Sequence, residues 1–181
     1  SKAMKIDPPF MVLATQNPIE QEGTYPLPEA ELDRFLIKIQ MDFPSAQNEI
    51  LLATRHARNT PVLHTSSQHL KIDIPSAQQQ CNAIQVDDSV AAYAVELVRQ
   101  TRSTTLLRHG AGPRASIALL KCAKAYAMLR GNDFITPDDV KSMAIPVMRH
   151  RVTPSPEIEI DGLQVDDVLR NMIDKVDAPR S

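Results

Sequence analysis

The sequence contains no tryptophan, and aromatic residues make up only 4% of its 181 residues. Hydrophobic residues account for 43%, so material for a core is present, and Ala and Leu dominate the second half. This composition favours helices packed through small side chains over a β-sandwich. A chain of this length could form one domain, or part of a sheet domain together with a small helical one.

Cysteine is also scarce, neither sign of charge is in excess, and no long apolar run is present. Cys81 and Cys122 form neither a metal-ligand pair nor a disulfide framework, so we interpret both as small residues of helix cores. The formal net charge of -2 draws the chain neither to nucleic acid nor to an anionic membrane. With no signal peptide or apolar run of sufficient length, we expect no membrane span and a location in the reducing cytoplasm.

A stretch near the N-terminus places polar residues between two apolar segments. The run Phe10–Ala14 is typical of a strand buried on both faces in a parallel sheet. A polar loop over 16–28 and a short helix over 29–33 follow, and alternating apolar residues over 35–41 predict a second strand. Ligands of open α/β sheets bind beyond the carboxyl ends of strands, so Asn17 would stand at such a position.

The rest of the chain is predicted to be mostly helical. Residues 42–45 look like a boundary, after which Ser45 caps a helix. Apolar residues recur at helical spacing from Val90 to Val98 and predict a buried stripe. In the helix that begins at Pro113, Ile117 is expected to face inward. The other expected elements are helices over 76–84, from Thr136 and over 164–176, and a short strand within 153–162.

Three segments resemble the MoxR family of AAA+ ATPases. The first, ATQNPIEQEGTYPLPEAELDRF (14–35), looks like the family's sensor-1-to-arginine-finger segment. The second, GAGPRASIALLKCAKAYAMLRG (110–131), is similar to its sensor-2 helix, and ITPDDVKSMAIPVMRHR (135–151) is similar to its lid. The resemblance implies that residues 1–43 are the C-terminal part of an α/β AAA+ core, with about two strands and a short helix. Residues 44–181 would then be an all-α helical lid domain, which makes the chain mostly α.

A P-loop, G-x-x-x-x-G-K-[ST], does not occur in the 181 residues. In such ATPases its amides and lysine hold the phosphates, and an acidic strand end, also missing here, helps hold magnesium. In the family these parts precede the segment with which this sequence begins, so we expect the chain to be the C-terminal part of such a protein. The resemblance implies ATP and Mg²⁺ as cofactors of the intact protein. The 181 residues alone are expected to bind neither and not to hydrolyse ATP.

Asn17 and Arg34 are the candidate catalytic residues. A carboxamide at Asn17, as sensor 1, can orient an attacking water beside a γ-phosphate without competing for magnesium. The alternative is that Asn17 only begins a turn with the proline that follows. Arg34, as an arginine finger supplied to a neighbouring subunit, would stabilise charge on the transferred phosphoryl group. The alternative for Arg34 is a weak intrahelical ion pair with Glu31.

Arg114 is the candidate cofactor-binding residue. It lies one residue inside a helix start, where free amides and the helix dipole already favour anions. As sensor 2 it would touch the phosphates of the ATP bound by the core of its own subunit and couple the state of that nucleotide to lid position. The alternative is a solvated arginine beside Lys121. Gly112 departs from the small polar residue expected there, so a more flexible helix entry is expected.

The remaining polar candidates have simpler interpretations. Glu20 and Glu22 suit a subunit interface or the loop itself better than a pair of general bases. His64 and His69 lack metal-ligand spacing, so no metal site is predicted. The basic run 149–151 is explained by charge complementarity at a helix end.

The leading hypothesis is an ATPase that works as a ring, expected to be a hexamer, and couples ATP hydrolysis to chaperone-like remodelling or cofactor insertion in client proteins. The resemblance points to a protein with a von Willebrand factor A domain as a further partner. The alternative is a helical protein-interaction module that works without nucleotide. Nucleic-acid binding would rest on the basic cluster from Arg99 to Arg114, and the near-neutral charge argues against it.

Overall fold

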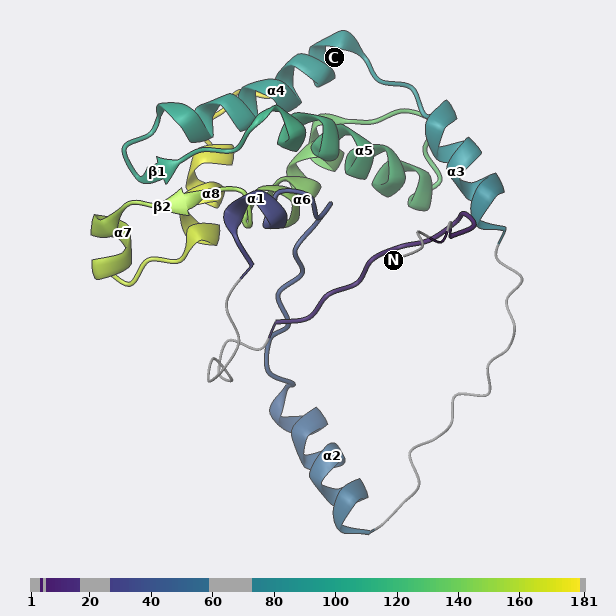
Figure 1. Ribbon diagram of the computed structural model, residues 1–181, viewed down its shortest axis with the longest axis vertical. Coiled ribbons are helices and arrows are strands. Elements are labelled where there is room, and N and C mark those ends of the chain that lie inside the picture. The colour runs from purple at the N-terminus through teal and green to yellow at the C-terminus, as the bar shows by residue number, and fades with distance from the viewer. Residues whose placement is uncertain (1–3, 5, 17–26, 59–72, 180–181) are drawn as a thin grey trace. The chain divides into compact units, whose positions relative to one another are not determined.

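The computed structural model describes residues 4, 6–16, 27–58 and 73–179. Its described residues fall into two compact units, one from residues 1–38 and 74–181 and the other from 39–73. Most of the helices belong to the first unit (Figure 1). The boundary expected between residues 43 and 44 stays a prediction.

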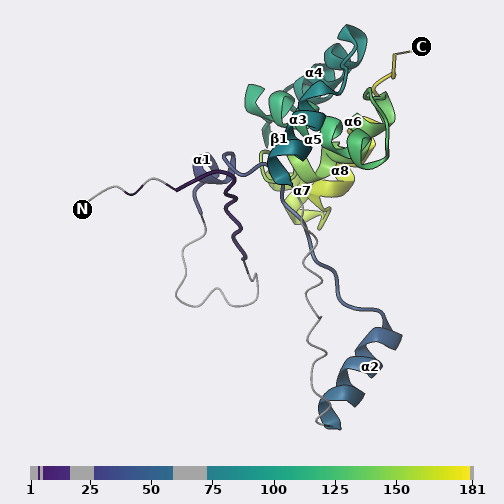
Figure 2. The ribbon, with the colours of Figure 1, turned by 90° about the vertical axis from the view of Figure 1, so that its right-hand side faces the viewer.

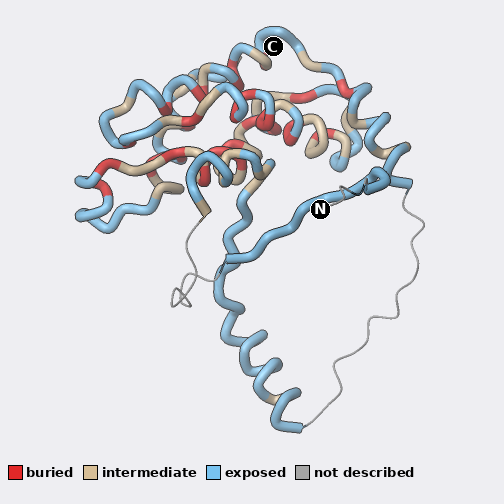
Figure 3. Tube along the Cα trace, in the orientation of Figure 1, coloured by how far each residue is buried: buried red, intermediate tan, exposed pale blue. Residues whose placement is uncertain are grey.

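Four helices build the core of the first unit. They are α4 (Asp88–Ser103), α5 (Pro113–Leu129), α6 (Pro137–Met148) and α8 (Val165–Ile173). Both α5 and α8 pack against α4 and α6 (Figure 2). Each helix contributes one of the largest fully buried side chains, and the buried positions follow these helices in Figure 3. Those side chains are Leu97, Leu119, Met148 and Leu169.

The start of each helix follows from local chemistry. The Asp87 carboxylate accepts a 2.8 Å hydrogen bond from the Ser89 amide and caps α4, whose predicted apolar stripe from Val90 to Val98 is buried. Thr136 and Asp139 form a capping box at α6, as the sequence predicted. Helix α5 begins with a proline at its first position and ends before Gly131, whose φ of 80° suits a residue without a side chain.

Shorter elements complete the first unit. Strand β1 (Leu107–His109) pairs antiparallel with β2 (Thr153–Pro154), with Leu107 opposite Pro154 and His109 opposite Thr153. Helix α3 (Ile74–Ala83) packs on α5, and α1 (Glu29–Leu32) is a single turn. The expected strand within 153–162 is therefore limited to two residues. Helix α7 (Pro156–Ile160) replaces the rest, because Pro156 starts a helix and only one of its two isoleucines, Ile158, is buried.

The second unit contains α2 (Ala46–Ala57). The Ser45 hydroxyl accepts a 3.4 Å hydrogen bond from the Asn48 amide, which confirms the predicted cap. No residue of α2 is buried, and its apolar residues Ile50, Leu51 and Leu52 are at least half exposed. This helix therefore packs no apolar face within its own unit.

The prediction of a mostly helical chain is confirmed, but two strands expected from the sequence are wrong. Residues 10–14 and 35–41 are not in strands in the structure. Phe10, Leu13 and Met41 are 65%, 81% and 88% exposed. An isolated extended segment gains no ladder hydrogen bonds, and no described residue forms a β-ladder with either segment. An apolar pattern alone therefore did not suffice to form a strand here.

Candidate functional site

Arg34 lies in the turn that follows the single helical turn of α1. The amides of Asp33, Arg34 and Phe35 donate to the carbonyls of Glu29, Glu31 and Leu32 at 2.9, 3.2 and 3.0 Å, so the chain stays tightly wound through residue 35. The Arg34 side chain is exposed and has no hydrogen bond or ion pair to any described residue. The alternative pair with Glu31 is therefore not formed. Its guanidinium is free to meet an external anion.

Arg114 occupies the second position of α5. Ile117 and Lys121 follow at intervals of three and four residues, which places all three side chains on one face of the helix. Ile117 is 58% exposed, so the expectation that it faces the core is wrong. The exposed face of α5 thus carries two cations around one apolar residue.

These two elements meet at one hollow of about 270 Å³. Its charged lining comes from four cationic side chains and one carboxylate, so the hollow is strongly electropositive. Arg34 and Arg114, two of the three residues predicted from the sequence, are therefore brought together, although 80 positions separate them. We call this the arginine hollow; its lining residues are Asp33, Arg34, Leu36, Arg114, Ile117, Ala118, Lys121 and Arg151.

Asp33 is the only carboxylate among the residues that line the arginine hollow, and it contacts two of the cations. Its Oδ2 lies 3.2 Å from Nη1 of Arg114, whose side chain is 65% exposed. Its Oδ1 lies 3.1 Å from Nε of Arg151, whose side chain is only 3% exposed. The exposed pair is weak because water and ions screen it, so an incoming phosphate could take Arg114 from Asp33. The Asp33–Arg151 pair is shielded from solvent and would remain in place.

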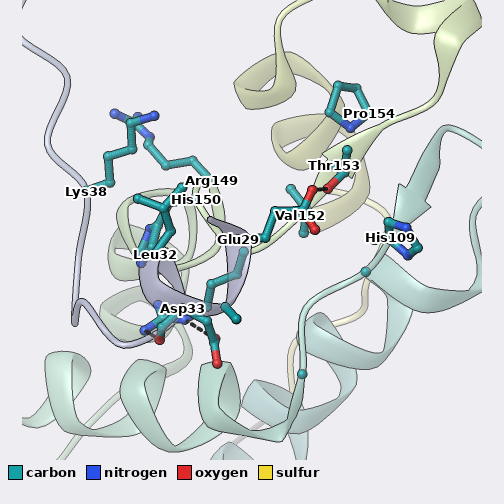
Figure 4. Close-up of a pocket in the computed structure, with 14 residues that line it drawn as sticks. Glu29, Leu32, Asp33, Lys38, His109, Arg149, His150, Val152, Thr153 and Pro154 are labelled. Carbon is teal, nitrogen blue, oxygen red and sulfur yellow. Dashed lines mark hydrogen bonds and ion pairs between the residues drawn. The ribbon is translucent and has the colours of Figure 1, made fainter. Parts of the chain in front are cut away.

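A second hollow of about 440 Å³ also has Asp33 and Arg151 in its lining, and Figure 4 shows this hollow. Its charged groups are mostly paired within the protein. The Thr153 hydroxyl donates to the Glu29 carboxylate at 2.8 Å, and Arg149 pairs with Asp166 at 2.6 Å. The arginine hollow, with its free Arg34, is therefore the better site for an anion.

Comparison with known proteins shows which family the chain resembles. The family model for the AAA lid domain matches residues 99–172, and that for the ATPase family associated with various cellular activities (AAA) matches residues 1–37. The uncharacterized protein YeaC of Bacillus subtilis is 39% identical over 97% of this chain and 55% of its own length. The chaperone MoxR1 of Mycobacterium tuberculosis is 34% identical over 95% of this chain and 48% of its own length. The chain is therefore homologous to part of the MoxR-family AAA+ ATPases.

A solved structure extends the likeness from sequence to fold. The crystal structure of a candidate ATPase from Cytophaga hutchinsonii superposes with a TM-score of 0.80 at 31% identity, over 96% of this chain and 56% of that one. The chain thus spans about half the length of the curated MoxR-family relatives that it matches.

The candidate Asn17 and four polar residues that were not assigned to the site lie outside the described residues. These are Asn17, Glu20, Glu22, His64 and His69. The roles proposed for Asn17 as sensor 1, Arg34 as arginine finger and Arg114 as sensor 2 stay predictions. Among the described residues, no group of three His, Cys, Asp or Glu side chains is placed to hold a metal ion. None of the described helices has the length and apolar character needed to cross a membrane.

Sequence reasoning missed Asp33, His150 and Arg151. The basic run 149–151 was attributed to charge complementarity at the end of α6, yet His150 and Arg151 both contact the turn that carries Arg34. More than 110 residues separate the two segments, so no local pattern indicates the contact.

His150 gives the site a dependence on pH. Its Nε2 lies 3.0 Å from the Phe35 carbonyl oxygen and must donate to it, while its buried Nδ1 has no partner among the described residues. Burial lowers the pKa of His150 below its usual value. The positive charges of Arg151 and Lys38 act in the same direction as burial, and the Phe35 hydrogen bond and Asp33 act against it.

We therefore expect acid to destabilise the fold through His150. When a folded-state pKa lies below the unfolded value of about 6.5, the unfolded protein binds more protons, so stability falls as the pH drops through that value. In the full-length gene product, the melting temperature should fall more steeply between about pH 7.5 and about pH 5 than in the His150→Gln variant, which keeps an N–H donor. Equal slopes would show that His150 does not contribute.

Proposed function

We propose that this chain supplies the arginine finger, the sensor-2 arginine and the lid of a MoxR-family ATPase that works as a ring. The observation that carries the proposal is the arginine hollow, in which Arg34 and Arg114 line one electropositive surface. Positive groups at such a site stabilise the charge that develops on a transferred phosphoryl group. The homology to that family supports the same chemistry.

The side chains of the arginine hollow fit the phosphates of ATP. Arg34 is unpaired among the described residues, Lys121 is exposed, and Arg114 is held only by a screened ion pair, so all three can turn to an anion at little cost. ATP supplies the reactive phosphoanhydride when it is bound. The part of this chain is to contact its phosphates. The described residues are assigned no role in holding magnesium.

The shared hollow also indicates which nucleotide the two arginines serve. An arginine finger acts across a subunit interface, on the nucleotide of the neighbouring subunit. Because Arg114 lines the same hollow as Arg34, it would reach that same nucleotide. We therefore propose that both arginines act on the neighbour's ATP, in place of the earlier expectation that Arg114 touches the nucleotide of its own core.

The use of the ATPase cycle is proposed from the relatives. MoxR1 is named a chaperone, which supports remodelling of client proteins driven by movement of the lid. Cofactor insertion into a client, with help from a protein that carries a von Willebrand factor A domain, is the finer form of this proposal. A six-membered ring is the expected assembly.

The direct test is magnesium-dependent ATP hydrolysis by the full-length gene product that contains this chain. Measurable hydrolysis that rises more than linearly with protein concentration, as subunits assemble, would support a ring with shared sites. A protein that neither binds nor hydrolyses ATP would overturn the proposal. The helical interaction module without nucleotide would then be the function to pursue.

Removal of Arg114 tests the contact with phosphate. A charge-assisted hydrogen bond contributes about 1.5–3 kcal/mol, so Arg114→Ala should lower kcat/KM for ATP by about 10- to 100-fold. Lys124→Ala is the matched control, because Lys124 lies on the same helix but donates to the Asn82 carbonyl at 2.8 Å instead of lining the hollow. Equal kinetics for the two variants would show that Arg114 is a solvated surface residue.

A further inference from the structure

Two residues that follow α6, His150 and Arg151, hold the turn that carries Arg34. Arg151 donates through Nε to Oδ1 of Asp33 at 3.1 Å and through Nη2 to the carbonyls of Asp33, at 3.1 Å, and Phe35. Through Nη1 it donates to the carbonyl of Leu36 at 3.1 Å. The His150 ring bonds the Phe35 carbonyl as well. The backbone on both sides of Arg34 is therefore bound by two adjacent residues, His150 and Arg151.

Every N–H donor of the Arg151 guanidinium takes part in a hydrogen bond. Its fifth N–H donates to the carbonyl of Val147, so each of its five donors has an acceptor, and four of the five acceptors belong to residues 33–36. The side chain is only 3% exposed, and burial lowers its pKa. A buried ion pair contributes little net stability relative to apolar packing, so its main effect is to select one geometry.

Two further bonds join the same segments. The Lys38 amide donates to the Pro146 carbonyl at 2.9 Å, and the Thr153 hydroxyl donates to the Glu29 carboxylate at 2.8 Å. Residues 146–153 thus bind residues 29–38 at both ends and near the middle. Because residues 146–148 belong to α6, the turn that carries Arg34 is coupled to the helical core of this unit.

On the basis of the function proposed above, we propose that Arg151, assisted by His150, is the positioning residue for Arg34. It fixes the backbone of residues 33–36 so that the Arg34 guanidinium projects into the arginine hollow. Movement of α6 is then transmitted to the arginine finger. A misplacement of about 1 Å at such a residue can cost about 100-fold in rate, so loss of the grip should be visible in kcat.

The test replaces Arg151 in the full-length gene product. Arg151→Gln should lower kcat for ATP hydrolysis by about 100-fold and raise KM less than Arg114→Ala does, because Arg114 itself remains in place. Arg151→Lys keeps the charge but offers three donors in place of five, so it should recover only part of kcat. Arg149→Gln is the matched control. Arg149 lies two positions before Arg151 and forms a half-buried ion pair with Asp166, which the substitution breaks. Neither Arg149 nor Asp166 has a hydrogen bond or ion pair to residues 33–36.

Two measurements separate positioning from loss of folding. The Arg34→Ala/Arg151→Gln double variant should be no less active than Arg34→Ala alone, because Arg151 acts only through Arg34. Hydrogen exchange should speed up at the amide of Lys38 in Arg151→Gln and stay unchanged there in Arg149→Gln. We expect Arg151→Gln and Arg149→Gln to lower the melting temperature by similar amounts. A loss of kcat and faster exchange at Lys38 in Arg151→Gln alone would then reflect positioning and not a general loss of stability.

The outcomes distinguish this inference from the proposed function. If Arg34→Ala is inactive while Arg151→Gln keeps full kcat, the inference fails and the arginine finger stands. If the two substitutions lower kcat by independent factors, Arg151 acts by another route and the inference also fails. If Arg34→Ala keeps full activity, the arginine finger itself is wrong, and Arg151 has nothing to position.

Discussion

The Arg34→Ala variant of the full-length gene product should lose about 10³- to 10⁵-fold in kcat for ATP hydrolysis, the range known for arginine fingers. Arg34 is exposed, lacks any partner among the described residues and lines the arginine hollow. Its removal should therefore disturb no internal contact, and the melting temperature should stay close to that of the wild type. Steady-state and single-turnover hydrolysis, measured beside thermal unfolding, check both expectations.

Mixed rings show whether the finger acts on a neighbour. Subunits with Arg34→Ala are combined with subunits that keep Arg34 but cannot bind ATP, and activity should return in the mixture because each defect lies on a different side of the interface. Arg170→Ala is the control. It removes an exposed arginine from an ion pair with Asp167 on α8 and should leave kcat unchanged. An Arg34→Ala protein with wild-type kcat would refute the assignment.

Gly110→Ala should lower the free energy of unfolding by about 3 kcal/mol. Gly110 lies against the end of α4, and a Cβ there would stand 2.4 Å from the Thr101 carbonyl oxygen and 2.8 Å from the Cα of Arg102. Both atoms belong to backbone, so the chain must move. That movement would break the bonds that tie the loop to α4, since the Ala111 amide donates to the Thr101 hydroxyl at 2.9 Å.

Gly112→Ala is the matched control in the same loop. No atom lies within 4 Å of a Cβ placed at Gly112, and its φ of -77° is open to any residue. The substitution should change the free energy of unfolding by less than about 1 kcal/mol. Alanine is a poorer N-cap for α5 than glycine, but it also lowers the conformational entropy of the unfolded chain, and the two effects oppose each other. Chemical denaturation of both variants provides the measurement. Equal losses would show that the close approach at Gly110 is not what the loop requires.

Local rules predicted the helical part of the fold well. The apolar period of α4, the capping box at Thr136 and the glycine stop at Gly131 each depend on residues within one or two turns of each other. Such patterns can be recognised from neighbouring residues alone, without knowledge of any tertiary contact. The same rules failed at residues 10–14 and 35–41. A strand needs a partner, and the apolar pattern of one segment does not supply it.

The candidate site was predicted only in part. Arg34 and Arg114 were identified because they stand within motifs that resemble the family, and the structure adds that they share one hollow. His150 and Arg151 were given a different explanation, since a helix end rich in positive charge satisfies a local rule. Their contacts with the Arg34 turn lie more than 110 residues away along the chain.

The sequence by itself determined the longer helices, several of their caps and the family resemblance, because each of these is encoded in short stretches whose chemistry is local. Only the tertiary structure decided that Asp33 pairs with both Arg114 and Arg151, and that five donors of one buried guanidinium converge on the end of α6 and the Arg34 turn. The physical reason is that burial sets the partners of a charge. A guanidinium removed from water must find its acceptors wherever the fold brings them, and no spacing along the chain specifies that place.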